Sequence, residues 1–99
     1  MAVVIIQHWP EEETERSTAN YDEISRRLRE SGAIPPEGCH LHCTGWTGHG
    51  FQIIEIWDTR EQFDRFVADK VMPLVMEVSA DDAREPVVTS YELHSLMTA

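Results

Sequence analysis

Two histidines, His40 and His42, alternate with cysteine and leucine, and this spacing could support two kinds of chemistry. An imidazole can act as a general base near neutral pH or hydrogen-bond a substrate carbonyl, and His42, in the middle of a strand, is the candidate for this role. The alternative is a histidine satisfied by a barrel or dimer contact. Residues two apart in a strand share a face, so both rings could also ligate one metal ion. The third ligand would have to be Glu55 of the same chain or His94 of the partner subunit, and neither is placed there by spacing. We therefore expect no required divalent metal.

Five further side chains are candidates for a small-molecule pocket. His8, near the end of the first apolar segment, is a second possible base and could line a pocket mouth together with Tyr21, although a partly exposed histidine is an equal alternative. Trp46 and Trp57 could stack a planar aromatic ligand, although a buried tryptophan is more commonly core. Glu55 interrupts an apolar strand: pointing inward it needs an Arg or His partner or a retained proton, and pointing outward it is an ordinary surface residue.

Composition excludes several classes of function. The chain has 99 residues, enough for one domain over 1–99, and a formal charge of −10, which repels nucleic-acid phosphates and anionic membrane surfaces. The sequence has no glycine-rich phosphate loop, nucleophile elbow or dinucleotide fingerprint, so we expect no cofactor. The start of the chain lacks a signal-peptide pattern, and Cys39 and Cys43 are too far apart along a strand to pair. We expect free thiols and a cytoplasmic protein.

Hydrophobic periodicity predicts four strands and two helical regions. The strands are expected at Val3–Trp9, Cys39–Trp46, Phe51–Trp57 and Val87–His94, where apolar or alternating residues recur. One helix is expected from about Thr18, capped by Ser17 and ended by Gly32, with Tyr21, Ile24 and Leu28 on its buried stripe. A second starts with a capping box, Thr59 and Gln62, buries Phe63, Phe66 and Val67, and runs to about Lys70. Pro73 makes Val71–Val78 either a kinked continuation of this helix or a fresh helical turn. Polar loops are expected at 11–15 and 80–86. His49 should lie at an exposed hairpin tip.

The order of elements predicts a ferredoxin-like α+β fold. A βαββαβ chain with right-handed crossovers forms a four-stranded antiparallel sheet of order 4-1-3-2, with both helices on one face. The first and third strands are apolar on both sides, so the helix-free face also needs a cover. A second copy of the sheet would provide it, and we expect a homodimer.

Nearly the whole chain resembles the dimeric α/β-barrel proteins, most closely small bacterial proteins of the antibiotic-biosynthesis-monooxygenase-like group. The resemblance lies in the opening strand Val3–Ile6, in Asn20-Tyr21-Asp22, in Pro35-Pro36-Glu37-Gly38, in the spacing of His42, Gly45 and Gly50, and in Ile54–Asp58 leading into Gln62–Phe66. It implies two subunits sharing a barrel, with a small pocket between sheet and helices in each. Members include cofactor-independent oxygenases of aromatic polyketides, haem-degrading enzymes and isomerases. The Asn, Trp and His trio of the haem-degrading members has no match here.

Two functions of different classes follow from these residues and this resemblance. The first is a non-catalytic homodimeric protein that binds a small, aromatic or polyketide-like molecule. The second is a cofactor-independent monooxygenase or isomerase in which His42 or His8 is the base, while Tyr21, Trp46, Trp57 and Glu55 shape the substrate site.

Overall fold

The computed structural model describes residues 2–10, 17–79 and 84–99, so the loop expected at 11–15 and part of the loop expected at 80–86 lie outside the described residues. The order of elements is the predicted one, with strand ends within two residues of expectation. The elements are β1 (Val3–Pro10), α1 (Ala19–Glu30), β2 (Cys39–Thr47), β3 (Gly50–Trp57), α2 (Arg60–Phe66), a π-helical turn (Val67–Val71), α3 (Met72–Val78) and β4 (Val87–Glu92).

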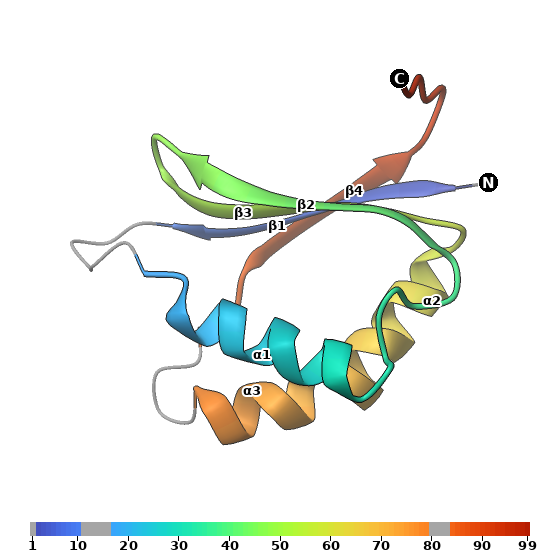
Figure 1. The fold of residues 1–99 in the computed structure, drawn as a ribbon. Coiled ribbons are helices and arrows are strands. Elements are labelled where there is room, and N and C mark those ends of the chain that lie inside the picture. The colour runs from blue at the N-terminus through green and yellow to red at the C-terminus, as the bar shows by residue number, and fades with distance from the viewer. Residues whose placement is uncertain (1, 11–16, 80–83) are drawn as a thin grey trace.

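The four strands form one antiparallel sheet in the order β2-β3-β1-β4. This is the predicted order, read from the opposite edge. All helices lie on one side of the sheet and the other side carries none, as Figure 1 shows. The ferredoxin-like α+β fold is therefore confirmed. No helix in the described parts of the chain is both long and apolar enough to cross a membrane.

The pairing of β2 with β3 contains an irregularity that the periodicity did not predict. Cys39 lies opposite Trp57 and Leu41 lies opposite Ile56, so His40 is an extra residue on β2. Two residues facing one on the partner strand make a β-bulge. The strict alternation expected for this strand is therefore wrong at Cys39, which packs against the buried core instead of facing away from it.

Helix α1 begins one residue later than expected and ends at the predicted glycine. The N-cap is Thr18, whose side chain makes no capping bond, so the predicted cap at Ser17 is wrong, although Ser17 Oγ accepts the Ala19 N–H at 3.2 Å. At the other end Gly32, at φ 77°, donates its N–H to the Arg29 carbonyl at 3.2 Å, and the next N–H reaches the Leu28 carbonyl at 2.9 Å. This pair of bonds is a Schellman motif, and its left-handed residue is best supplied by glycine.

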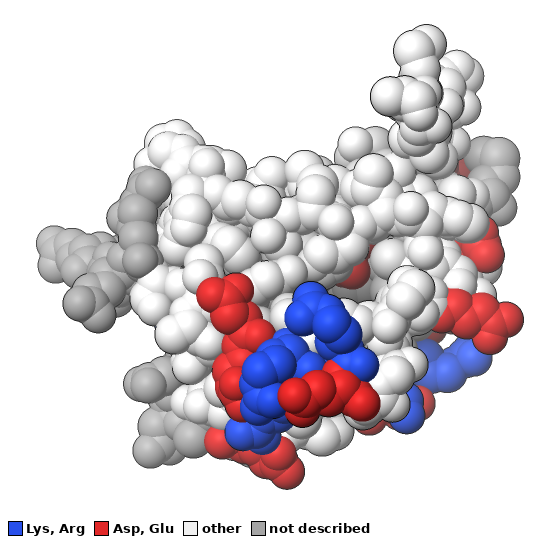
Figure 2. All heavy atoms as spheres, in the orientation of Figure 1, with Lys and Arg blue, Asp and Glu red and all other residues white. Residues whose placement is uncertain are grey.

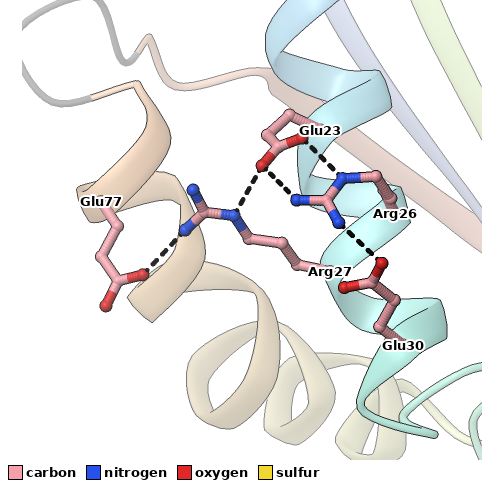
Figure 3. A network of polar contacts seen from close by, with 5 residues as sticks. All are labelled: Glu23, Arg26, Arg27, Glu30 and Glu77. Carbon is pink, nitrogen blue, oxygen red and sulfur yellow. Dashed lines mark hydrogen bonds and ion pairs between the residues drawn. The ribbon is translucent and has the colours of Figure 1, made fainter.

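The outer face of α1 is a network of ion pairs, drawn in Figure 3. Arg26 binds Glu23 and Glu30, whereas Arg27 binds Glu23 and reaches across to Glu77 of α3 at 3.0 Å. Hydrogen bonds from the two guanidinium groups lower the pKa of Glu23 to about 2. The charges of Arg26 and Arg27 are thus already matched by acidic side chains on the outer surface.

The second helical region has the predicted capping box and resolves the alternatives left open by Pro73. Thr59 Oγ1 accepts the Gln62 N–H, and Gln62 Oε1 accepts the Thr59 N–H at 3.1 Å. Helix α2 passes through the π-helical turn into α3, which begins at Met72 with Pro73 in its first turn. The chain therefore continues as helix, and proline occupies a position where a missing N–H matters least.

The core lies between the sheet and these helices. Ile5, Trp57 and Phe63 are its most buried members, and four partly buried side chains pack against them: Val3, Cys39, Phe66 and Val67. The predicted stripe of the second helical region is therefore confirmed. A cavity also lies between the sheet and the helices.

Candidate functional site

A buried carboxylate and a histidine meet across the β2–β3 pair. Glu55 lies directly opposite His42 in the strand register, and its side chain is only 7% exposed, against 42% for the imidazole. Glu55 Oε2 lies 2.8 Å from His42 Nδ1. A carboxylate can only accept hydrogen bonds, so Nδ1 carries the proton and donates it to Glu55. This contact fixes the ring orientation and leaves Nε2 as the acceptor of the neutral imidazole.

The other nitrogen of His42 is met by the hydroxyl of Tyr21. The Tyr21 oxygen lies 2.7 Å from Nε2, and the two rings are nearly parallel, at 16°. Because Nε2 carries the lone pair, Tyr21 O–H is the donor. Tyr21 comes from the first turn of α1, so the helix and two strands converge on one imidazole.

The second oxygen of Glu55 is also satisfied. Gln7 Nε2, from β1, donates to Glu55 Oε1 at 3.1 Å. With donors on both oxygens, the largely buried carboxylate has hydrogen-bond partners that hold it in one orientation. The inward alternative for Glu55, with a histidine partner, is the arrangement that the structure shows.

The side chains of Tyr21, His42 and Glu55 line a cavity of about 1160 Å³ between α1, the helical layer and the sheet. Ligand pockets commonly measure about 300–1,000 Å³, so this space can hold a molecule of several rings. Its walls are largely apolar and include Ile24, Leu28 and residues of α3. A histidine whose Nε2 accepts the Tyr21 hydroxyl proton therefore lines a mostly apolar space that is partly open to solvent.

Aromatic rings surround the histidine end of this cavity. Phe51 contacts Trp9, Tyr21 and Trp46, with ring centroids 5.2 to 6.1 Å apart. All four rings line the cavity. Trp9 Nε1–H also donates to the Arg84 carbonyl at 3.0 Å, which ties the segment before β4 to this end. Tilted and edge-on rings of this kind form a wall suited to a planar ligand.

The remaining predicted residues lie in different places. Trp57 is 1% exposed in the core and lines a separate, smaller pocket of about 230 Å³, so it does not border the large cavity. His8 lies between two cavity-lining residues of β1, and alternation turns it to the helix-free face. His40 pairs with Asp58 instead of with His42. Their expected roles remain predictions, and His42, Tyr21, Trp46 and Glu55 are the candidates that the fold brings together.

No group of three or more potential metal ligands forms among residues 2–10, 17–79 and 84–99. His40 and His42 each have a carboxylate partner of their own, Asp58 and Glu55. The bulge at His40 separates two rings that ideal alternation would have placed side by side. His40 and His42 therefore do not belong to one group of potential metal ligands within the described residues.

Sequence reasoning did not identify Gln7, Trp9 or Phe51 as site residues. For Gln7 a signal existed, because an amide interrupts the apolar strand Val3–Trp9 just as Glu55 interrupts β3. Two polar residues on central strands can satisfy each other when the strands pair. Trp9 and Phe51 carried no such signal, since both fit an ordinary buried strand.

Comparison with known proteins finds the same fold. No family model and no curated protein matches the sequence. Among solved structures, the protein Rv0793 from Mycobacterium tuberculosis matches at a TM-score of 0.69 and 16% identity, covering 99% of this chain and 100% of that one. A dimeric ferredoxin-like protein of unknown function from Thermobifida fusca matches at 0.61 and 14%, covering 94% and 92%.

Two further matches carry functional names. SnoaB, a cofactor-independent oxygenase from Streptomyces nogalater, matches at a TM-score of 0.58 and 13% identity, covering 99% of this chain and 98% of that one. A structure described as an antibiotic biosynthesis monooxygenase matches at 0.57 and 24%, covering 96% and 100%. The resemblance stated from the sequence is therefore confirmed, and the chain has the ferredoxin-like fold of antibiotic-biosynthesis-monooxygenase-like proteins.

Proposed function

We propose that the protein binds a planar aromatic, polyketide-like molecule in the large cavity and that His42 removes a weakly acidic proton from it. The observation that carries this proposal is the Glu55–His42–Tyr21 chain at the cavity wall. The further reaction is cofactor-independent oxygenation or isomerisation of the resulting anion. Such chemistry needs a base and a shaped apolar site, and both are present.

Glu55 prepares His42 for proton removal by fixing the orientation of its ring. The carboxylate holds Nδ1–H, so Nε2 points its lone pair towards the cavity, and the imidazolium formed by proton uptake gains a negative neighbour. Tyr21 occupies Nε2 in the empty site. A ligand hydroxyl or acidic C–H group therefore takes the place of the Tyr21 hydroxyl when it reaches the base.

The similarity to SnoaB, named as a cofactor-independent oxygenase, supports an oxygenase over other classes. In the oxygenase form, a ring CH₂ group becomes C=O, dioxygen supplies the oxygen atom, and the second oxygen atom leaves as water. The alternative is a binding protein without turnover. Both functions would use the same cavity. They differ in whether His42 removes the acidic proton from the bound ligand.

We propose a homodimer as the working state, in which a second sheet covers the helix-free face. That face exposes Val87 and Tyr91 of β4, each more than half accessible. The dimeric Thermobifida fusca neighbour supports this arrangement. Neither a metal, nucleic acid nor a membrane surface is a partner in this proposal, and the free thiols of Cys39 and Cys43 suit the reducing cytoplasm.

The first prediction tests the base with 1,8-dihydroxyanthrone, a planar probe with an acidic ring CH₂ group. The parent protein should bind it and accelerate its conversion by dioxygen to the quinone, followed by absorbance. His42→Gln should lower the rate about 10²- to 10⁴-fold, the usual contribution of a general base, with binding retained. Glu55→Gln should lower it less, because the ring keeps a hydrogen-bond partner but loses the charge.

His49→Ala is the matched control, since His49 is an exposed histidine at the hairpin turn that does not line the cavity. Its rate and affinity should equal those of the parent. Binding of the probe without any acceleration by the parent would favour the binding protein. Equal rates in the parent and in a normally folded His42→Gln variant would remove His42 as the base.

A further inference from the structure

The basic side chains of this acidic protein are mostly paired with acids. Arg26 and Arg27 bind Glu23, Glu30 and Glu77 (Figure 3), Arg60 binds Asp64, and Arg65 approaches Glu61. Like Lys70 and Arg84, Arg29 has no acidic partner among the described residues. Its neighbour Glu30 is already bound to Arg26.

Arg29 borders the cavity that holds His42. It belongs to the last turn of α1, on the helix face that also contributes Tyr21, Ser25 and Leu28 to the lining. Figure 2 shows basic side chains over α1 at the edge of a hollow between this helix and the sheet. Within residues 2–10, 17–79 and 84–99 this guanidinium has no ion pair that a ligand would have to break.

We propose, resting on the function proposed above, that the ligand of this cavity is an elongated aromatic carboxylate whose anionic group is bound by Arg29. Tyr21 and Arg29 are eight residues apart on α1, which at 1.5 Å per residue separates them by about 12 Å along the axis. A fused system of three rings with a terminal carboxylate spans this length. Its far ring then lies among Trp46, Phe51 and Tyr21, beside His42.

The negative net charge of the protein explains why an anionic ligand would need this contact. The chain carries a net charge of −10, so an anionic ligand is repelled at long range. A local cation is needed to retain it, and a guanidinium binds carboxylate through two parallel hydrogen bonds. Arg84 also lines the cavity, but the next residue, Glu85, lines it too and offsets the charge.

The test uses anthracene-2-carboxylate and its neutral analogue anthracene-2-carboxamide, each titrated by fluorescence into the full-length protein. The parent should bind the carboxylate about tenfold more tightly than the amide, and added salt should reduce that preference. Arg29→Gln should abolish the preference while affinity for the amide is unchanged. Arg29→Lys should restore part of it.

Arg65→Gln is the matched control, because it removes the same charge from an exposed site on α2 that does not line the large cavity. It should keep the preference for carboxylate. Equal binding of both probes by the parent, or an unchanged preference in Arg29→Gln, overturns this inference while the aromatic cavity stands. Failure of both probes to bind overturns the cavity proposal and this inference together.

Discussion

At the scale of single residues, the site depends on polar side chains that would be unfavourable if they stood alone. Glu55 is buried on a central strand, and its burial is tolerated because His42 and Gln7 occupy both oxygens. Removal of either partner would leave one oxygen of the buried Glu55 carboxylate without a hydrogen-bond donor. The histidine and its supporting residues therefore act as a unit, and single substitutions among them should not be additive.

The two cysteines should differ in reactivity. Burial, and to a lesser degree the charge of Glu55, raises the pKa of the Cys39 thiol, whereas Cys43 is exposed. The thiolate is the reactive form, so a higher pKa and poorer access both slow alkylation of Cys39. Iodoacetamide at pH 8, followed by mass spectrometry of peptides, should modify Cys43 first.

The same experiment has an internal check. Unfolding in guanidinium chloride removes the difference in burial, so both thiols should then react at similar rates. Faster alkylation of Cys39 in the folded protein would contradict its placement against the core.

At the scale of elements, the segment that leads into β2 packs closely against the start of α2. Gly38 has a φ of 90°, and a Cβ added there would lie 2.5 Å from the side-chain oxygen of Gln62. That oxygen caps the start of α2 by accepting the Thr59 N–H. The glycine thus provides both a left-handed backbone and room for the capping box.

Gly38→Ala should destabilise the protein by about 2 kcal/mol, the sum of left-handed strain and a disturbed cap. The expected result is a melting temperature lower by roughly 10 °C, measured by circular dichroism. Gly45→Ala is the control, because a Cβ at that position meets nothing within 4 Å. Comparable melting of the two variants would mean that Gln62 moves aside at little cost.

At the scale of the whole molecule, the helix-free face decides the assembly. Val4 and Ile56 are buried within this face, while Val87 and Tyr91 remain exposed along its β4 side. A second sheet packed on the first would bury Val87 and Tyr91, as in other two-sheet arrangements. A chain of this size also has a small core of its own, so association adds stability that the monomer lacks.

Sedimentation at micromolar concentration should therefore give about twice the chain mass of 11.4 kDa. Tyr91→Arg places a charge at the centre of the exposed β4 side and should shift the equilibrium to monomer. Val88→Thr is the control, since Val88 lines the cavity on the opposite face. A stable, folded parent monomer would exclude the homodimer.

Local patterns in the sequence determined the elements and their order. The apolar strand Val3–Trp9, the capping box at Thr59 and the stop at Gly32 each act within a few residues, so their structural consequences could be predicted. The order of strands and helices then restricted the sheet to one topology. The same patterns marked His42, Tyr21, Trp46 and Glu55 as candidates without showing which would meet.

Only the tertiary structure decided which of these side chains lie in contact, because the contacts depend on the register between distant segments of the chain. The bulge at His40 divides the two histidines between different carboxylates, and the pairing of β2 with β3 places His42 opposite Glu55. Trp57 packs in the core and Trp46 lines the cavity, although both are strand tryptophans. A shift of one residue in register reverses the face of every later side chain, so local periodicity alone could not determine the site.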